Sequence, residues 1–303
     1  MKKILVAGLI NIETSAKIEE FPIKYTPIDF CFHGVESTIS GVGYNMTKGL
    51  RTLGDKVELL SVLGDDLYRL AIEKELTELG VSTDHLAYLA KETATSVILY
   101  DPSGKRKILL DLKDIQDFDY PEAGVDALIE EADIVVPCNI NFSRSILRKA
   151  KAMNKLIASD VHVIASVEDD YNKEYMEAAD ILFFSNENIL GKEKEFIREV
   201  ADTFHNQIIV VGMGAQGALL YQSTTGELQE FAAVTTREIV STVGAGDALF
   251  TAFLHFYSNG CTPEEALQNA IVFASYKIGE KGAAAGFLSE AKLLELKKSL
   301  NLQ

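Results

Sequence analysis

The stretch STVGAGDALFTAFL, residues 241–254, joins a glycine-rich turn directly to an apolar helical pattern. Small residues at the start of a helix leave its first N–H groups uncovered, and the helix dipole adds to their attraction for an anion such as phosphate. Asp247 would then lie beside the phosphate, where its carboxylate can accept the proton of an attacking hydroxyl group. A purely structural interpretation, in which the glycines only turn the chain and Asp247 only favours the helix dipole, fits these residues equally well.

Upstream of this stretch, short apolar segments rich in β-branched residues alternate with helical patterns. The strand-like segments span residues 3–7, 57–62, 134–136, 156–159, 181–184 and 208–211. Strands that are apolar on both faces are typical of a parallel sheet covered by helices on both sides. Helical patterns occupy residues 45–53, 66–79, 143–153 and 171–179, and further helices are expected to begin at Ala245, Thr262 and Ser289. The sequence therefore predicts an α/β fold with a doubly wound, mainly parallel sheet flanked by helices.

Two segments interrupt this alternation. Residues 13–40 are mixed polar and β-branched, and residues 94–112 predict a hairpin, TSVILY then RKILLDL, that turns on residues 101–104. Together, 13–40 and 94–112 would form a small β-sheet lid over one edge of a main domain made of residues 1–12, 41–93 and 113–303. A second hairpin is expected over residues 218–222 and 228–231.

The composition narrows the choice of partners. The chain has 29 Lys and Arg against 45 Asp and Glu, a net charge of −16, which would repel nucleic acids and anionic membranes. Cys31, Cys138 and Cys261 are far apart and show no CxxC spacing, so neither a disulfide framework nor a zinc site is expected, and a cytoplasmic location fits. No stretch approaches the ~20 apolar residues of a membrane-spanning helix. A small molecule is the expected partner.

Two further glycine motifs point to ligand binding. SGVGYN, residues 40–45, ends a predicted lid strand and opens a helix, so that backbone can approach a ligand closely and Asn45 can bond to it. Taken alone, this motif fits an ordinary turn with an asparagine cap better. GMGAQG, residues 212–217, matches GxGxxG, but residues 218–221 predict a strand where a dinucleotide site needs a helix. An NAD-dependent oxidoreductase is therefore disfavoured.

Taken in order, these motifs resemble those of the ribokinase-like (PfkB) family. GLINIE, residues 8–13, is similar to the family's sugar-contact strand, SGVGYN to its substrate motif, and Asn186 to its nucleotide-side asparagine. GAQG, residues 214–217, is similar to the family's GxxG turn, and VGAGD, residues 243–247, to its catalytic signature. The resemblance runs from residue 4 to residue 287. It implies a kinase that uses ATP and Mg2+.

The resemblance also assigns residues to roles. Asp247 would be the base, with Gly244, Ala245 and Gly246 forming the anion hole. The residues implied to face the substrate are Asn11, Glu13, Gly41, Gly43, Asn45 and Asn139. The residues implied to line the nucleotide pocket are Asn186, Gly214, Gly217, Asn269 and Ala274. Lid sheets of this family often pair across a dimer, and residues 25–32 are apolar enough to allow a homodimer here.

Several positions depart from the family's pattern. Ser241 replaces an aspartate that helps relatives to bind a monovalent cation, which argues against activation by K+, although backbone carbonyls near Gly282 could contribute ligands. The acid of the Asn-x-x-Glu element that organises Mg2+ is displaced to Glu187, the candidate metal residue. Glu13 stands where aspartate is usual, and Val42 replaces the lysine of ribose enzymes, which disfavours ribose.

The choice of substrate rests on two motifs. GVGYN together with PCNIN, residues 137–141, looks more like pseudouridine kinases, which phosphorylate a C-nucleoside at its 5′ hydroxyl. We therefore expect a kinase for a pseudouridine-like nucleoside, with fructose or another free sugar as the next candidate. A non-catalytic sugar- or nucleotide-binding relative is the remaining alternative, since it would tolerate the changes at Ser241 and Glu187.

Overall fold

The computed structural model describes residues 2–103 and 105–301, and within them a nine-stranded sheet forms the centre of the protein. The predicted turn residue Gly104, together with Met1, Leu302 and Gln303, lies outside the described residues. The strand order is β13-β12-β11-β10-β9-β8-β1-β4-β5. The bounds are β1 (Lys3–Ala7), β4 (Lys56–Gly64), β5 (Leu86–Ala90), β8 (Ile134–Pro137), β9 (Leu156–Val163), β10 (Ile181–Ser185), β11 (Ile208–Gly212), β12 (Ala218–Gln222) and β13 (Glu227–Phe231). Pairing is parallel from β11 to β5, and β12 and β13 add an antiparallel edge.

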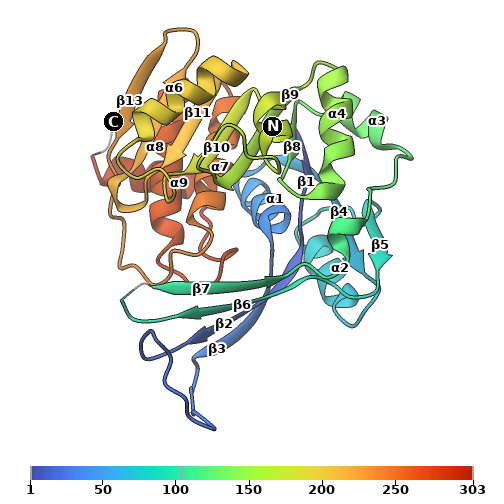
Figure 1. Ribbon diagram of the computed structural model, residues 1–303, viewed down its shortest axis with the longest axis vertical. Coiled ribbons are helices and arrows are strands. Elements are labelled where there is room, and N and C mark those ends of the chain that lie inside the picture. The colour runs from blue at the N-terminus through green and yellow to red at the C-terminus, as the bar shows by residue number, and fades with distance from the viewer. Residues whose placement is uncertain (1, 104, 302–303) are drawn as a thin grey trace.

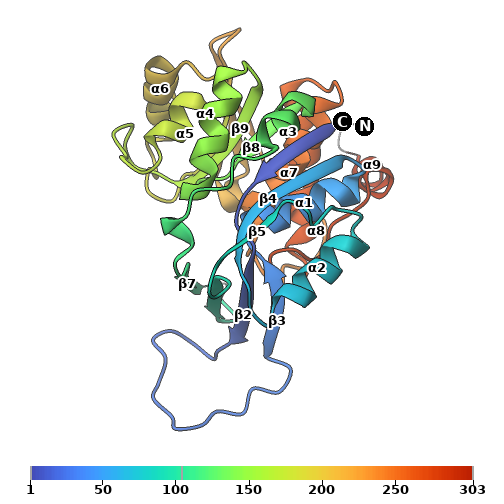
Figure 2. The same ribbon diagram turned by 90° about the vertical axis from the view of Figure 1, so that its right-hand side faces the viewer.

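Helices cover both faces of this sheet, as the two ribbon views show (Figure 1, Figure 2). The helices that pack on one face are α1 (Val42–Leu53), α2 (Arg69–Glu78), α7 (Ala245–Ser258), α8 (Pro263–Lys277) and α9 (Glu290–Ser299). The helices on the other face are α3 (Val125–Glu131), α4 (Arg144–Ala152), α5 (Lys173–Ala178) and α6 (Glu193–Phe204). Side chains alternate along each strand, so Ile4 and Val6 of β1 enter the first core while Leu5 enters the second. Burial on both faces explains why these strands are apolar throughout.

A second, smaller sheet extends from the carboxyl end of β1. Its order is β3-β2-β6-β7, formed by β2 (Asn11–Lys17), β3 (Val35–Ser40), β6 (Thr95–Tyr100) and β7 (Arg106–Asp111). Only residues 8–10 separate β1 from β2, so the small sheet starts where the central strand ends. Residues 18–34 form a long loop that projects away from the rest of the protein (Figure 2).

The chain reverses its direction of travel across the large sheet at β1, which pairs with β4 on one side and β8 on the other. Ligands of open α/β sheets bind outside the carboxyl ends of the strands at such a point. There the start of α1 lies directly against the end of β1, because a Cβ atom at Gly43 would come within 2.5 Å of the carbonyl carbon of Gly8. The close approach brings the first turn of α1 into the crevice.

The strands and helices predicted from the sequence are all present, with ends shifted by a few residues. β12 follows the turn after β11, which confirms that the GxGxxG match opens no helix. The sequence analysis missed β5, α3 and α6, although α6 buries Phe196, Ile197 and Val200 at helical spacing. Among the residues that the structure describes, no helix combines the length and apolar character that crossing a membrane requires.

Candidate active site

A chain of polar contacts links the small sheet to the first turn of α7. The Ser40 hydroxyl, at the end of β3, donates to Oε2 of Glu13 on β2 over 2.9 Å and lies 3.4 Å from Oδ1 of Asn45. Nδ2 of Asn45, on α1, donates to Oδ2 of Asp247 over 2.7 Å. Asn45 therefore contacts the predicted base in this structure. This contact fixes the orientation of the carboxylate.

The predicted anion hole lies at the start of α7. Gly244 precedes the helix with φ 74°, and a Cβ atom there would come within 2.5 Å of the Ala283 carbonyl oxygen, so only glycine fits. The Ala245 N–H is already bonded to the Thr242 carbonyl at 3.2 Å. The N–H groups of Gly246 and Asp247 belong to the first turn and have no acceptor within the helix. Gly246 is exposed and Asp247 is half-buried, so this turn is open to solvent.

Acidic side chains are buried around this crevice. Burial raises the pKa of Glu13, and the hydrogen bond from Ser40 and the charge of Lys277 act in the opposite direction. Burial also raises the pKa of Asp160, at the end of β9, where the backbone N–H of His162 donates to it over 2.8 Å. Asp247 itself is only half-buried. The crevice thus holds one accessible carboxylate between two enclosed ones.

A cationic stretch of the small sheet approaches the same turn. Nη1 of Arg106, the first residue of β7, donates to Oγ1 of Thr242 over 2.6 Å, and its Nη2 lies 3.9 Å from Glu187. A cavity of about 680 Å³ opens here, lined by Phe21, Lys105, Arg106, Lys107 and Glu187. Three adjacent cations line this cavity in a chain of net charge −16, so its local charge is opposite to that of the chain as a whole.

Asn186, which follows β10, contacts an acid other than Glu187, the candidate metal residue. Its Nδ2 donates to Oε1 of Glu193, the first residue of α6, over 2.9 Å, and this hydrogen bond lowers the pKa of Glu193. The side chain of Glu187 is 63% exposed and faces Arg106. Mg2+ is commonly held by one or two carboxylates together with substrate phosphates, and an ionised Glu193 beside Asn186 fits that requirement.

The remaining residues predicted for the nucleotide lie nearby or deeper. Gly214 and Gly217 bound the turn after β11, beside a cavity of about 780 Å³ between that turn and the start of α6. The residues that line this cavity include Lys192, Glu193, Met213, Gln216 and Phe231. On α8, Ala274 is partly exposed, whereas Asn269 is 4% exposed and lies inside the core.

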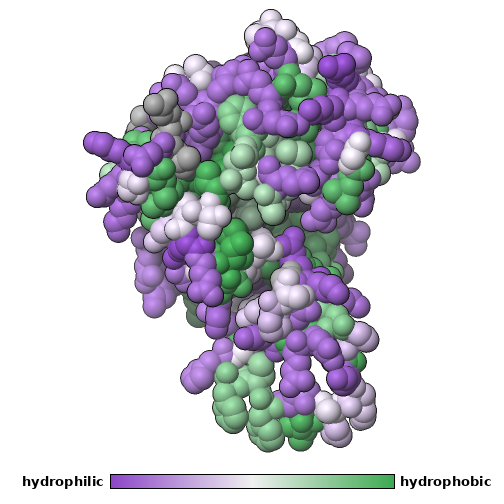
Figure 3. Space-filling model, turned by 90° about the vertical axis from the view of Figure 1, so that its left-hand side faces the viewer, coloured by the Kyte–Doolittle hydropathy of each residue, from purple (hydrophilic) through white to green (hydrophobic). Residues whose placement is uncertain are grey.

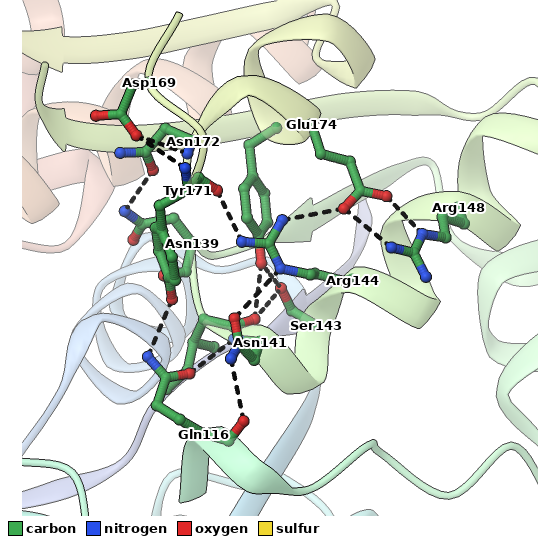
Figure 4. Close-up of polar contacts among 12 residues, drawn as sticks. Gln116, Asn139, Asn141, Ser143, Arg144, Arg148, Asp169, Tyr171, Asn172 and Glu174 are labelled. Carbon is green, nitrogen blue, oxygen red and sulfur yellow. Dashed lines mark hydrogen bonds and ion pairs between the residues drawn. The ribbon is translucent and has the colours of Figure 1, made fainter.

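Asn139, after β8, belongs to a polar network that Figure 4 shows in detail. Its Nδ2 donates to Oδ1 of Asn172 over 3.1 Å, and the Tyr171 hydroxyl donates to its carbonyl over 3.1 Å. Gln116 donates to the same hydroxyl, and the Arg144 guanidinium lies over the Tyr171 ring, 4.9 Å from its centroid (Figure 4). The network holds Asn139 on the side of the crevice that α4 and α5 cover.

Comparison with known proteins identifies the family of the chain. The model of the pfkB family of carbohydrate kinases matches residues 1–290, and the chain belongs to this family of phosphotransferases. The resemblance inferred from the motifs is therefore confirmed.

Two similar proteins differ in what they phosphorylate. An acarbose 7(IV)-phosphotransferase from Actinoplanes sp. is 26% identical over 96% of this chain and 97% of that protein. A pseudouridine kinase from Escherichia coli is 25% identical over 88% of this chain and 87% of that protein.

Solved structures share the fold. A microbiome-derived acarbose kinase superposes with a TM-score of 0.87 at 22% identity, covering 97% of this chain and 98% of that one. A nucleoside kinase from Methanocaldococcus jannaschii gives 0.80 at 21% identity, with 99% of each chain covered. These likenesses confirm the ribokinase-like α/β architecture.

The sequence analysis missed four residues of this region. They are Ser40, Arg106, Glu193 and Lys277. Ser40 lay inside a quoted motif without a role, and Arg106 lay in a predicted strand. Lys277 gave a weak sequence signal, because it is a lone cation at the end of an apolar helical pattern. The contact between Glu193 and Asn186 is visible only in the folded structure.

Proposed function

We propose that the protein is an ATP-dependent kinase that transfers the γ-phosphoryl group to a hydroxyl of a sugar or nucleoside. The contact between Asn45 and Asp247 carries this proposal, because it holds one carboxylate oxygen and leaves the other to accept the hydroxyl proton. The free N–H groups of Gly246 and Asp247 stabilise negative charge on the transferring group. The small sheet acts as a lid that excludes water when it closes over the substrate.

The substrate contacts in this proposal come from the small sheet and its junction with β1. Asn11 donates to the Ser96 hydroxyl over 2.9 Å, while its buried Oδ1 has no hydrogen-bond partner in the described residues. Glu13 offers a second enclosed acceptor. Two acceptors side by side suit the vicinal hydroxyl groups of a sugar or ribosyl ring, since each hydroxyl can donate one hydrogen bond. Gly41, Gly43 and Asn139 complete the proposed substrate wall.

The cofactors in this proposal are ATP and Mg2+. Lys105, Arg106 and Lys107 would hold the phosphates, and Gly214, Gly217 and Ala274 would border the nucleoside. When bound, Mg2+ would neutralise negative charge on the phosphates. Glu193, oriented by Asn186, is a better-placed group for its hydration shell than Glu187, which faces Arg106 and solvent.

For the acceptor, a pseudouridine-like nucleoside remains the leading proposal, supported by GVGYN, by PCNIN and by the similarity to the pseudouridine kinase. The similarity to the acarbose 7(IV)-phosphotransferase over almost the whole of both chains favours an oligosaccharide as the second candidate. Fructose or another free sugar remains the alternative expected from the sequence.

The experiment is ADP release from MgATP with a panel of pseudouridine, uridine, adenosine, acarbose, maltose, fructose and ribose. Turnover with one acceptor, accompanied by the mass of its monophosphate, would establish the kinase and name its substrate class. ATP binding without turnover of any acceptor would favour the non-catalytic alternative.

Arg106→Ala is expected to lower kcat/KM for ATP by about 10- to 100-fold, because a charge-assisted contact contributes about 1.5–3 kcal/mol. Lys107→Ala, its neighbour on β7, is the matched control and should have a smaller effect, since it lacks the bond to Thr242. Steady-state kinetics at saturating acceptor measure both. Equal losses in the two variants would show that only total charge matters.

We also propose that two copies pair through the small sheet. Exposed apolar side chains gather on the projecting loop at one end of the protein (Figure 3), with Tyr25 91%, Phe30 81% and Phe32 84% exposed. β7 is an edge strand whose Ile108, Leu109 and Leu110 are also exposed. An open apolar edge of this kind pairs readily with another chain, and a second copy offers the same surface in return.

The triple change Tyr25→Ser, Phe30→Ser, Phe32→Ser is expected to convert a dimer into a monomer. Sedimentation velocity at micromolar concentration measures the state. The control is Leu67→Ser with Leu70→Ser, which removes two apolar side chains at the start of α2 that are 79% and 77% exposed, and it should leave the dimer intact. A wild-type monomer would contradict this proposal.

A further inference from the structure

Lys277, the last residue of α8, is completely buried although it carries a charge. Its ammonium donates to the carbonyl oxygens of Val243 and of Gly282, the latter over 2.6 Å. Both partners are backbone carbonyls rather than carboxylates. Burial of a lysine is costly, so an enclosed ammonium at this position requires an explanation.

The two carbonyls belong to loops that frame the crevice. Val243 directly precedes Gly244, which begins the turn into α7. Gly282 precedes Ala283, whose carbonyl packs against Gly244 and whose backbone lies near enough to the Glu13 carboxylate to lower its pKa. The ammonium therefore joins the loop that presents the anion hole to the loop that contacts the enclosed substrate acid. The ammonium lies on the protein side of the predicted anion hole, and its positive charge there also favours an anion bound at the hole.

The surroundings are those of a small cation site. Backbone carbonyl oxygens are the ligands that replace the hydration shell of K+, and an ammonium group of similar size accepts the same geometry. The charges of Asp247 and Glu13 favour the ammonium, whereas Arg106 and Arg237 oppose it. Burial has the largest effect and lowers the pKa of Lys277 to about 8.

Resting on the proposed kinase function, we propose that Lys277 is a built-in cation. Its ammonium fills a carbonyl-lined position behind the anion hole and holds Val243 so that the first N–H groups of α7 aim at the transferring phosphoryl group. Turnover of the wild type therefore needs no added monovalent cation. Removal of the side chain opens a site that an external cation can fill. Lys277 is a positioning residue and touches no reacting atom.

The first test compares salts at equal ionic strength. Wild-type kcat should be the same in K+ as in tetramethylammonium, which is too large for the position. The kcat of Lys277→Ala in tetramethylammonium should be about 100-fold lower than that of the wild type, because a displacement of the anion-hole N–H groups by about 1 Å has an effect of that size. In K+ or NH4+ the variant should regain most of this activity. Lys277→Met, which fills the volume without charge, should lose activity in every salt. Lys281→Ala, an exposed lysine of the same loop, is the matched control.

The second test is the pH dependence of kcat. Lys277 is charged below a pKa of about 8 and neutral above it, so wild-type kcat should fall above about pH 8. The K+-rescued Lys277→Ala enzyme should lack this fall, because K+ does not titrate. The contribution of Lys277 to the free energy of unfolding has a different pH dependence. In the unfolded chain the lysine keeps its proton up to about pH 10.4, whereas in the folded protein it loses it above about pH 8. Between these two pKa values the unfolded state binds more protons, so the contribution of Lys277 to stability rises with pH.

Thermal stability separates this inference from the kinase proposal. The Tm of Lys277→Ala should rise in K+ or NH4+ relative to tetramethylammonium, and that of the wild type should not. If the Tm of Lys277→Ala rises in this way but the wild type turns over no acceptor, the result would support the cation site and contradict the proposed kinase function. A wild-type enzyme that needs K+ for turnover would overturn the inference. So would a folded Lys277→Ala variant whose kcat and Tm are both the same in K+ as in tetramethylammonium. If this variant does not fold, the comparison of wild-type kcat in K+ and in tetramethylammonium decides.

Discussion

Asp247→Asn is expected to lower kcat by about 1,000-fold while nucleotide and acceptor still bind. A positioned general base contributes typically about 100- to 10,000-fold, and an amide cannot take up the hydroxyl proton. The change is nearly isosteric, so α7 and its free N–H groups keep their geometry. The side-chain amide can also turn its oxygen towards Nδ2 of Asn45 and preserve that contact.

Steady-state kinetics with the acceptor found in the panel measure the loss, and calorimetric titration measures binding. The control is Asp202→Asn, an exposed acid on α6 whose replacement changes the net charge equally. A D247N variant with nearly normal kcat would remove Asp247 from the role of base, whatever its position beside the anion hole.

Gly43→Ala is expected to reduce both stability and turnover. The added Cβ atom would lie 2.5 Å from the carbonyl carbon and 2.6 Å from the oxygen of Gly8, so backbone must move. Overpacking of this kind costs about 1–3 kcal/mol of unfolding free energy. A displaced α1 also carries Asn45 away from Asp247, and a misplacement of about 1 Å can lower kcat about 100-fold.

Denaturant unfolding and kcat, measured on the same preparation, test this prediction. Gly212→Ala is the control for stability, because its Cβ atom would find its nearest neighbours at 3.9 Å, an ordinary contact distance. If Gly43→Ala were as stable and active as wild type, the contact between α1 and β1 would not position the site.

The organisation of the large sheet follows from local patterns. Strands such as Ile208–Gly212 are apolar on both faces, and that property alone predicts a parallel sheet between helix layers. The edge strand β5, LAYLA, is also an apolar run, and its omission reflects a short pattern left unassigned. Helix α6 carries a clear periodicity, and its omission reflects a pattern left unassigned rather than an absent signal.

The site residues chosen from the sequence remain predictions. The acid near Asn186 shows what spacing leaves open, because spacing pointed to Glu187 as the candidate metal residue, whereas Asn186 donates its hydrogen bond to Glu193, seven residues along. A longer turn carries the chain past the expected position before α6 begins. The number of residues between two positions does not determine where a turn places a side chain in space.

By itself, the sequence determined most of the strands and helices in their order, apart from β5, α3 and α6. It also determined the glycine-rich start of α7 and the carboxylate beside it, because propensity and periodicity are properties of contiguous residues. Tertiary structure alone decided that Asn45 holds Asp247 across 202 positions and that Lys277 reaches Val243 across 34. Such contacts depend on which helices pack against one another, and packing follows from the whole core rather than from any one stretch.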